Sequence, residues 1–190
     1  IVEYCLATRL CIGYLPEGAP GYGEMGVRSF LEFIALARGF EGKKAIEAAG
    51  AAIERLNLHG VPEQPIETLS KGFKRRVGLA QAIIHDPQVL ILDEPTNGLD
   101  PQGIHQIREL IKQIAAQGTT ILLVEQNAKM ALEISKYAYI MESGKIVLEG
   151  VSRELQDNPD VKEFYMGVTQ GGGRKSFKEV KSYKRRKRWM

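Results

Sequence analysis

The stretch VLILDEPTNGLDP, residues 89–101, decides the fold class. Its four leading apolar residues have the length of a buried strand and run directly into two adjacent carboxylates, Asp93 and Glu94. In an open parallel sheet, ligands bind at the carboxyl ends of the strands, where side chains and backbone groups face a crevice. An exposed acidic turn or a helix cap is the ordinary explanation of a lone Asp-Glu pair. The whole stretch instead predicts a strand with chemistry at its end.

The segments on either side predict an α/β fold. Four segments carry apolar residues at helical spacing, and they begin at Val27, Ile46, Phe73 and Ile104. Four apolar runs have strand length, at residues 89–92, 121–124, 137–141 and 146–148. Strands that alternate with helices indicate a parallel sheet covered on both faces, and the last two runs indicate an antiparallel hairpin through Ser143-Gly144. A short strand before Pro16 and two short helices, at 152–158 and 159–166, complete the expected elements.

A second segment, ETLSKGFKRRVGLAQAI at residues 67–83, predicts an anion site at a helix start. Ser70 stands at the N-cap position and Gly72 follows closely. Free N–H groups and the positive end of the helix dipole point to such a site, and the Ser70 hydroxyl adds a donor. Four basic residues deepen the positive potential, namely Lys71, Lys74, Arg75 and Arg76. A capped basic helix is commonly only structural, and its position ahead of the acidic strand end favours the functional interpretation.

The sequence resembles the ATP-binding subunits of ABC transporters over roughly residues 11–150. Three segments in this order carry the resemblance: the Ser-x-Gly segment, the strand that ends in Asp93-Glu94, and the Gly-Leu-Asp turn. The resemblance implies a P-loop NTPase-like core with a helical subdomain at about residues 22–86. It implies ATP and Mg²⁺ as cofactors. Asp93 would hold Mg²⁺ as the Walker B carboxylate, and Glu94 would be the catalytic residue that orients and deprotonates the attacking water.

The resemblance also supplies the remaining site residues. The nucleotide-binding positions that it implies are Glu17, Ser70, Lys71, Gly72, Asp93, Asp100 and Gln126. Glu17 stands where most members have Gln, so it offers an oxygen to Mg²⁺ or water but adds a negative charge. Gln126 stands at the switch position, which is usually His. Its amide can form a hydrogen bond to a γ-phosphate but cannot carry a proton.

Two branches of the family share features with this chain. Lys71, at the third position of the Ser-x-Gly signature, resembles exporters of the ABC-2 kind. From residue 119 to the basic end, the sequence resembles the ATP-binding subunits of branched-chain amino-acid importers. The expected function is therefore ATP-driven membrane transport, with branched-chain amino acids as one candidate substrate.

No G-x-x-x-x-G-K-S/T motif occurs in the 190 residues. That loop normally wraps the β-phosphate in backbone N–H groups. Gly42-Lys43-Lys44 lacks the hydroxyl residue, and GGGRKS at 171–176 has Arg174 where a glycine is required. We therefore expect an N-terminally truncated ATPase domain whose sheet has an unpaired edge. Alone it should bind ATP weakly and hydrolyse it negligibly, and a second, complete ABC ATPase subunit in a head-to-tail dimer would supply the loop.

The resemblance implies a partial ATPase domain at 1–168, and the charge distribution indicates a basic tail at 169–190. Residues 171–190 carry nine Lys or Arg and one acid, Glu179. Such a tail could meet anionic lipid, nucleic acid or an acidic partner, although a solvated end is the simpler explanation. The chain has two cysteines without metal-ligand spacing, and it has neither a spanning apolar run nor a signal-like start. We expect a cytoplasmic protein, peripheral on the inner face of the cell membrane, with transmembrane transporter subunits as partners.

Two alternative functions belong to other classes. One is an inert gene fragment or fusion remnant, consistent with the mixed branch features. The other is a soluble ABC-type protein acting on nucleic acid or ribosomes, which the basic tail would serve. Neither a second ABC half nor a long charged helical insertion occurs in the sequence, so nucleic acid is not the expected partner.

Overall fold

The computed structural model describes residues 10–18 and 21–165. The chain divides into two compact units, Ile1–Gln126 and Asn127–Met190. The expected α/β class, with a parallel sheet and a separate antiparallel hairpin, is confirmed. The boundary expected at residues 168–169 lies outside the described residues, as does the basic tail, so that domain division stays a prediction.

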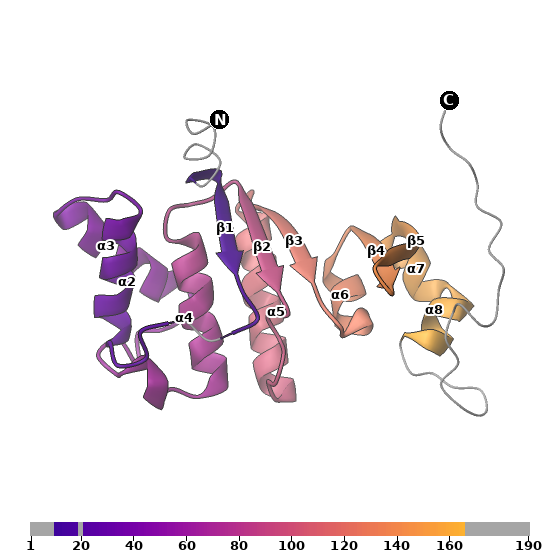
Figure 1. The fold of residues 1–190 in the computed structure, drawn as a ribbon, viewed down its shortest axis with the longest axis horizontal. Helices are drawn as coiled ribbons and strands as arrows, with labels where there is room; N and C mark the ends of the chain where they lie inside the picture. The colour runs from indigo at the N-terminus through magenta and orange to yellow at the C-terminus, as the bar shows by residue number, and fades with distance from the viewer. Residues whose placement is uncertain (1–9, 19–20, 166–190) are drawn as a thin grey trace. The chain divides into compact units, whose positions relative to one another are not determined.

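The first unit contains a parallel sheet of three strands in the order β1-β2-β3 (Figure 1). The strands are β1 (Ile12–Leu15), β2 (Val89–Asp93) and β3 (Thr120–Val124). Parallel neighbours need crossover connections, which are usually helical. Between β1 and β2 the chain forms α2 (Val27–Ala37), α3 (Lys43–Arg55), the 3-10 turn η1 (Ile66–Thr68) and α4 (Lys71–Ile83). Between β2 and β3 it forms α5 (Pro101–Ala116).

The core of this unit lies on one face of the sheet. Leu15, Leu90 and Leu92 are at most 1% exposed. β1 approaches α4 so closely that a Cβ atom on Gly13 would lie 2.2 Å from the carbonyl oxygen of Ala82. Only glycine permits this approach, because the atom in the way belongs to the backbone of the helix.

The opposite face of the sheet is open in the described residues. Tyr14, Leu122 and Val124 are 49%, 54% and 49% exposed. The prediction that helices cover both faces is therefore wrong for the described part of the chain. The unpaired edge that we expected is present among the described residues, where β3 pairs with β2 alone.

The two helices that precede the signature segment form an amphipathic pair. α2 buries Val27, Phe30 and Leu31, and α3 buries a row of alanines that ends at Ile53. Small alanine side chains let one helix lie close against another. The helical spacing in the sequence predicted both helices, whereas the limits of a separate helical subdomain stay a prediction.

The second unit is a hairpin with short helices. It contains α6 (Ala128–Ile134), β4 (Tyr137–Glu142), β5 (Lys145–Val151), α7 (Ser152–Asp157) and α8 (Pro159–Phe164). Ser143 and Gly144 turn the hairpin with φ values of 49° and 74°, as two-residue hairpin loops require. Leu132, Leu155 and Val161 form the core. The last helix ends at Phe164, earlier than the expected residue 166, and α6 was not predicted.

Candidate functional site

The predicted catalytic residue, Glu94, directly follows β2. Its backbone N–H donates to the carbonyl oxygen of Val124 at 2.9 Å, which continues the pairing of β2 with β3. The backbone of Glu94 has φ 45°, a left-handed conformation that residues with a side chain rarely adopt. The side-chain amide Nε2 of Gln126 donates to Glu94 Oε1 at 2.9 Å. The structure therefore brings together two of the residues that the sequence predicted.

Glu17 and Asp93 lie at the carboxyl ends of β1 and β2. Asn97 Nδ2 donates to Glu17 Oε1 at 2.8 Å, which joins the segment after β1 to the turn after β2. The hydroxyl of Tyr14 donates to Asp93 Oδ2 over a longer distance of 3.5 Å. We use the term strand-end cluster for Glu17, Asp93, Glu94, Glu125 and Gln126, which follow or end the three parallel strands.

Sequence reasoning missed Thr96 and Glu125. The backbone N–H and the hydroxyl of Thr96 both donate to Glu125 Oε1, at 3.0 and 2.6 Å. Thr96 is 5% exposed. These two hydrogen bonds connect the turn after β2 to the segment after β3. They restrict the position of Glu94, which lies between β2 and that turn. Their places in the sequence could have indicated both residues. Thr96 lies within the stretch 89–101, and Glu125 directly precedes Gln126.

Arg75 differs most from its sequence interpretation. Its guanidinium Nη1 donates to the carbonyl oxygens of Pro16 at 3.1 Å and Gly18 at 3.2 Å, and the residue is 8% exposed. Burial lowers the pKa of Arg75, and the four carboxylates of the strand-end cluster act in the opposite direction. Arg75 therefore does not deepen the positive potential at the start of α4. It lies one turn further along the helix, on the side that faces the segment after β1.

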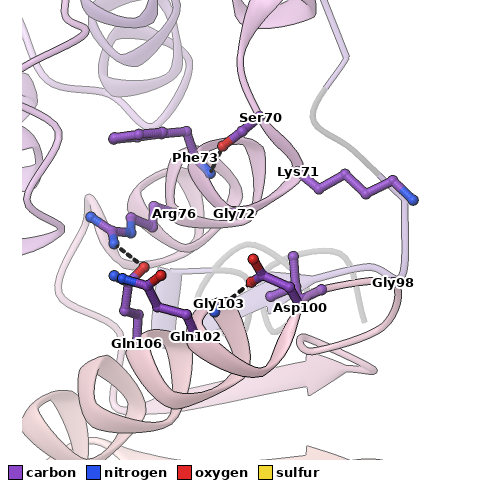
Figure 2. Close-up of a pocket in the computed structure, with 11 residues that line it drawn as sticks. Ser70, Lys71, Gly72, Phe73, Arg76, Gly98, Asp100, Gln102, Gly103 and Gln106 are labelled. Carbon is purple, nitrogen blue, oxygen red and sulfur yellow. Dashed lines mark hydrogen bonds between the residues drawn. The ribbon is translucent and has the colours of Figure 1, made fainter.

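The other predicted residues line a second feature, a pocket of about 390 Å³ at the starts of α4 and α5 (Figure 2). Ser70 caps α4, where its Oγ accepts from Phe73 N at 3.4 Å. Asp100 caps α5, where its Oδ1 accepts from Gly103 N at 2.7 Å. Two helix N-termini thus border one pocket, and we call it the helix-start pocket. Their N–H groups and dipoles favour an anionic ligand.

Two basic side chains of the helix-start pocket have different surroundings. Lys71 extends towards Gly98 (Figure 2), where a Cβ atom on Gly98 would lie 3.4 Å from Lys71 Nζ. Arg76 donates from Nη2 to Gln106 Oε1 at 2.6 Å, and its guanidinium lies 5.1 Å from the centre of the Phe73 ring. Arg76 therefore joins α4 to α5, whereas Lys71 reaches the turn that precedes Asp100.

The predicted site residues thus fall into two groups. Glu17, Asp93, Glu94 and Gln126 belong to the strand-end cluster, and Ser70, Lys71, Gly72 and Asp100 line the helix-start pocket. None of the described helices is long and apolar enough to cross a membrane.

Comparison with known proteins gives a consistent set of similarities. The family model described as ABC transporter matches residues 7–97. The high-affinity branched-chain amino acid transport ATP-binding protein BraG of Pseudomonas aeruginosa is 34% identical, over 84% of this chain and 68% of BraG. The daunorubicin resistance ATP-binding protein DrrA3 of Streptomyces coeruleorubidus is 32% identical, over 82% of this chain and 49% of DrrA3.

A solved structure shares the fold. The protein cbiO1 of Clostridium perfringens, described as part of the ABC transporter complex cbiONQ, has a TM-score of 0.72 and 27% sequence identity. The match covers 80% of this chain and 62% of cbiO1. The chain spans about half the length of the first curated relatives that it matches.

Proposed function

The chain belongs to the ABC transporter ATP-binding proteins, and from this premise we propose that it contributes part of a nucleotide site to an ATP-driven transporter. In this proposal the chain works on the cytoplasmic face of the membrane, held there by transmembrane transporter subunits. Its strand-end cluster serves one nucleotide position, and its helix-start pocket serves another.

The contact between Glu94 and Gln126 carries the proposal. A carboxylate that accepts one hydrogen bond from an amide keeps its other oxygen for a water molecule. Glu94 is then the catalytic residue, which orients the water and takes its proton. Gln126 holds the carboxylate in place, at a distance of 2.9 Å, and cannot itself receive the proton.

The carboxylates of the strand-end cluster fit a Mg²⁺ ion that arrives with a nucleotide. Mg²⁺ at phosphate sites is commonly held by one or two carboxylates, with phosphate oxygens and water as the other ligands. Asp93 would be the main protein ligand, with Glu17 near it. Among the described residues, no group of three or more His, Cys, Asp or Glu side chains could hold a metal by itself. The bound ion would neutralise negative charge on the phosphate oxygens.

The helix-start pocket is proposed to receive the phosphates of a nucleotide that a second ABC ATPase subunit holds. Ser70 and Gly72 would present their N–H groups, Lys71 its ammonium, and Asp100 would keep the start of α5 in place. The 190 residues contain no P-loop motif. A complete subunit, paired head to tail, would supply that loop, and the nucleotide would lie between the two chains.

Calorimetry of Mg-ATP tests this proposal. We expect weak binding by the chain alone, and additional binding in a mixture with a complete subunit such as BraG, beyond that of BraG alone. Gly72→Glu should remove the additional binding, because it places a negative charge at the helix start in a position with no steric conflict. Gly60→Glu adds the same charge where nothing lies within 4 Å, and serves as the matched control. Tight binding by the chain alone would contradict the proposal.

We further propose branched-chain amino acids as the transported substrate. The identity to BraG supports it, as does the resemblance of the sequence from residue 119 to the basic end to importers of this kind. The identity to DrrA3 is only slightly lower. Uptake of labelled leucine into vesicles that contain this chain, BraG and matching transmembrane subunits would support the proposal, and ATP-dependent drug export alone would contradict it.

A further inference from the structure

The hairpin of β4 and β5 (Figure 1) has apolar side chains on both of its faces. One face, which includes Ile140 and Leu148, packs against the core of the second unit. The other face, which we call the hairpin face, carries five apolar side chains that are 46% to 62% exposed: Tyr137, Tyr139, Met141, Ile146 and Val151. The strand register brings them together, because Tyr137 lies opposite Val151. Met141 likewise lies opposite Ile146. A contiguous exposed patch of this kind marks an interaction surface.

The middle of the hairpin face combines an acid with two aromatic rings. The exposed Glu149 lies opposite Tyr139 in the register. The ring centres of Tyr137 and Tyr139 are 5.2 Å apart. Faces of aromatic rings attract lysine and arginine side chains, and the apolar stems of those side chains can lie along apolar surface. The hairpin face therefore fits a segment that combines basic side chains with aromatic ones.

The basic tail, residues 169–190, has this composition. It contains nine Lys or Arg and one acid, whereas residues 127–165 of the same unit contain seven acids and five bases. The two parts therefore carry opposite net charge. Phe177, Tyr183 and Trp189 stand six residues apart, and an even interval places side chains on one side of an extended segment.

The basic tail is also long enough to reach the hairpin face. It begins five residues after α8, which ends at Phe164. Fully extended, its 22 residues would span about 70 Å. The seven-residue strand β5 is only about 23 Å long.

We propose that the basic tail docks on the hairpin face of its own chain. The aromatic side chains of the tail contact the apolar positions of the face, and basic side chains lie over the two tyrosine rings and beside Glu149. Covalent attachment favours the chain's own tail over that of a second copy, because a linked segment has a high effective concentration. The docked tail shields an apolar face from association with other chains. The inference concerns neither nucleotide position and does not rest on the proposed function.

Trp189 is the only tryptophan in the 190 residues, so its fluorescence reports on the basic tail. In the whole chain, we expect emission at a shorter wavelength and weaker quenching by acrylamide than in a synthetic peptide of residues 169–190. Tyr139→Ser and Glu149→Lys should each restore the quenching seen in the peptide. Leu122→Ser is the matched control, because it removes an apolar side chain of similar exposure, 54%, from the first unit. It should leave the protection of Trp189 unchanged.

A chain that ends at residue 168 gives a second measurement. It should bind more of the dye 8-anilinonaphthalene-1-sulfonate than the whole chain does, because the hairpin face is uncovered. The added peptide of residues 169–190 should reverse this increase, and a peptide with serine at its three aromatic positions should not. If Tyr139→Ser does not fold, as judged by circular dichroism, Glu149→Lys and this peptide measurement decide the question.

Four results would overturn the proposal. Equal quenching of Trp189 in the chain and in the peptide would show that the tail is not docked. Protection that disappears on dilution would assign the tail to a second copy. Protection that arises only with vesicles of phosphatidylglycerol would assign it to anionic lipid. Protection lost in Leu122→Ser would place the tail on the parallel sheet instead.

Discussion

Replacing Gly13 by alanine should destabilise the first unit strongly. The added Cβ would lie 2.2 Å from the carbonyl oxygen of Ala82, and 3.0 Å from carbon atoms of Leu90 and Pro87, where ordinary contact begins at 3.4 Å. Ala82 O belongs to the backbone of α4, so no side-chain rotation relieves the overlap, and β1 must move away from the helix. Overpacking in a core costs about 1–3 kcal/mol, and we expect Gly13→Ala to cost about 3 kcal/mol.

Urea unfolding followed by far-ultraviolet circular dichroism measures this cost. With a slope of about 2 kcal/mol/M, the midpoint should fall by about 1.5 M. Gly50→Ala is the matched control, because Gly50 lies within α3 and nothing stands within 4 Å of its added Cβ. It should stabilise the chain by roughly 0.5–1 kcal/mol. A loss below about 1 kcal/mol for Gly13→Ala would refute the close approach of β1 to α4.

Two further substitutions test the caps and the pH dependence. Asp100→Ala removes the acceptor that Gly103 N contacts at 2.7 Å, and should lower the stability of the first unit by about 1 kcal/mol in thermal unfolding, whereas Asp100→Asn should retain most of it. Burial, followed by the charge of Arg38, lowers the pKa of His85 from its ordinary 6.5. With this lowered pKa, the unfolded chain binds more protons than the folded chain as the pH falls. The contribution of His85 to the free energy of unfolding is therefore present above pH 6.5, and it is lost as the pH falls towards the lowered pKa of His85 in the folded chain. His85→Gln should therefore flatten the decline of the urea midpoint between about pH 7 and about pH 5.5.

The elements with strong periodicity were predictable from the sequence, and those stabilised by tertiary contacts were not. α2 to α5 show helical spacing over three or more turns, and β2 is a continuous apolar run that ends in Asp93. α6 has only seven residues, too few for a period to emerge. The open face of the sheet could not be predicted from β3, because its continuous apolar run is the pattern of a strand that is covered on both faces.

The composition of the strand-end cluster was predictable in part. Asp93 and Glu94 stand at the end of a recognisable strand, and the resemblance to ABC ATPases indicated Glu17 and Gln126. The position of Arg75 was not predictable, because its partners are the backbone oxygens of Pro16 and Gly18, which are 59 and 57 residues away in the sequence. Every residue has a backbone carbonyl, so the sequence does not indicate which carbonyl accepts a hydrogen bond. The buried position of Arg75 could therefore not be distinguished from the positions of the basic residues around it.

The backbone of Glu94 has an evolutionary consequence. A left-handed conformation costs a residue with a side chain roughly 1 kcal/mol more than it costs glycine, and Glu94 adopts φ 45°. The chain would relax locally if glycine replaced Glu94, yet it would lose the carboxylate held by Gln126. Under the proposed function, selection for a stable fold and selection for hydrolysis act in opposite directions at this position. Glutamine shares the strain of glutamate, so Glu94→Gln removes the proposed base with little change in stability.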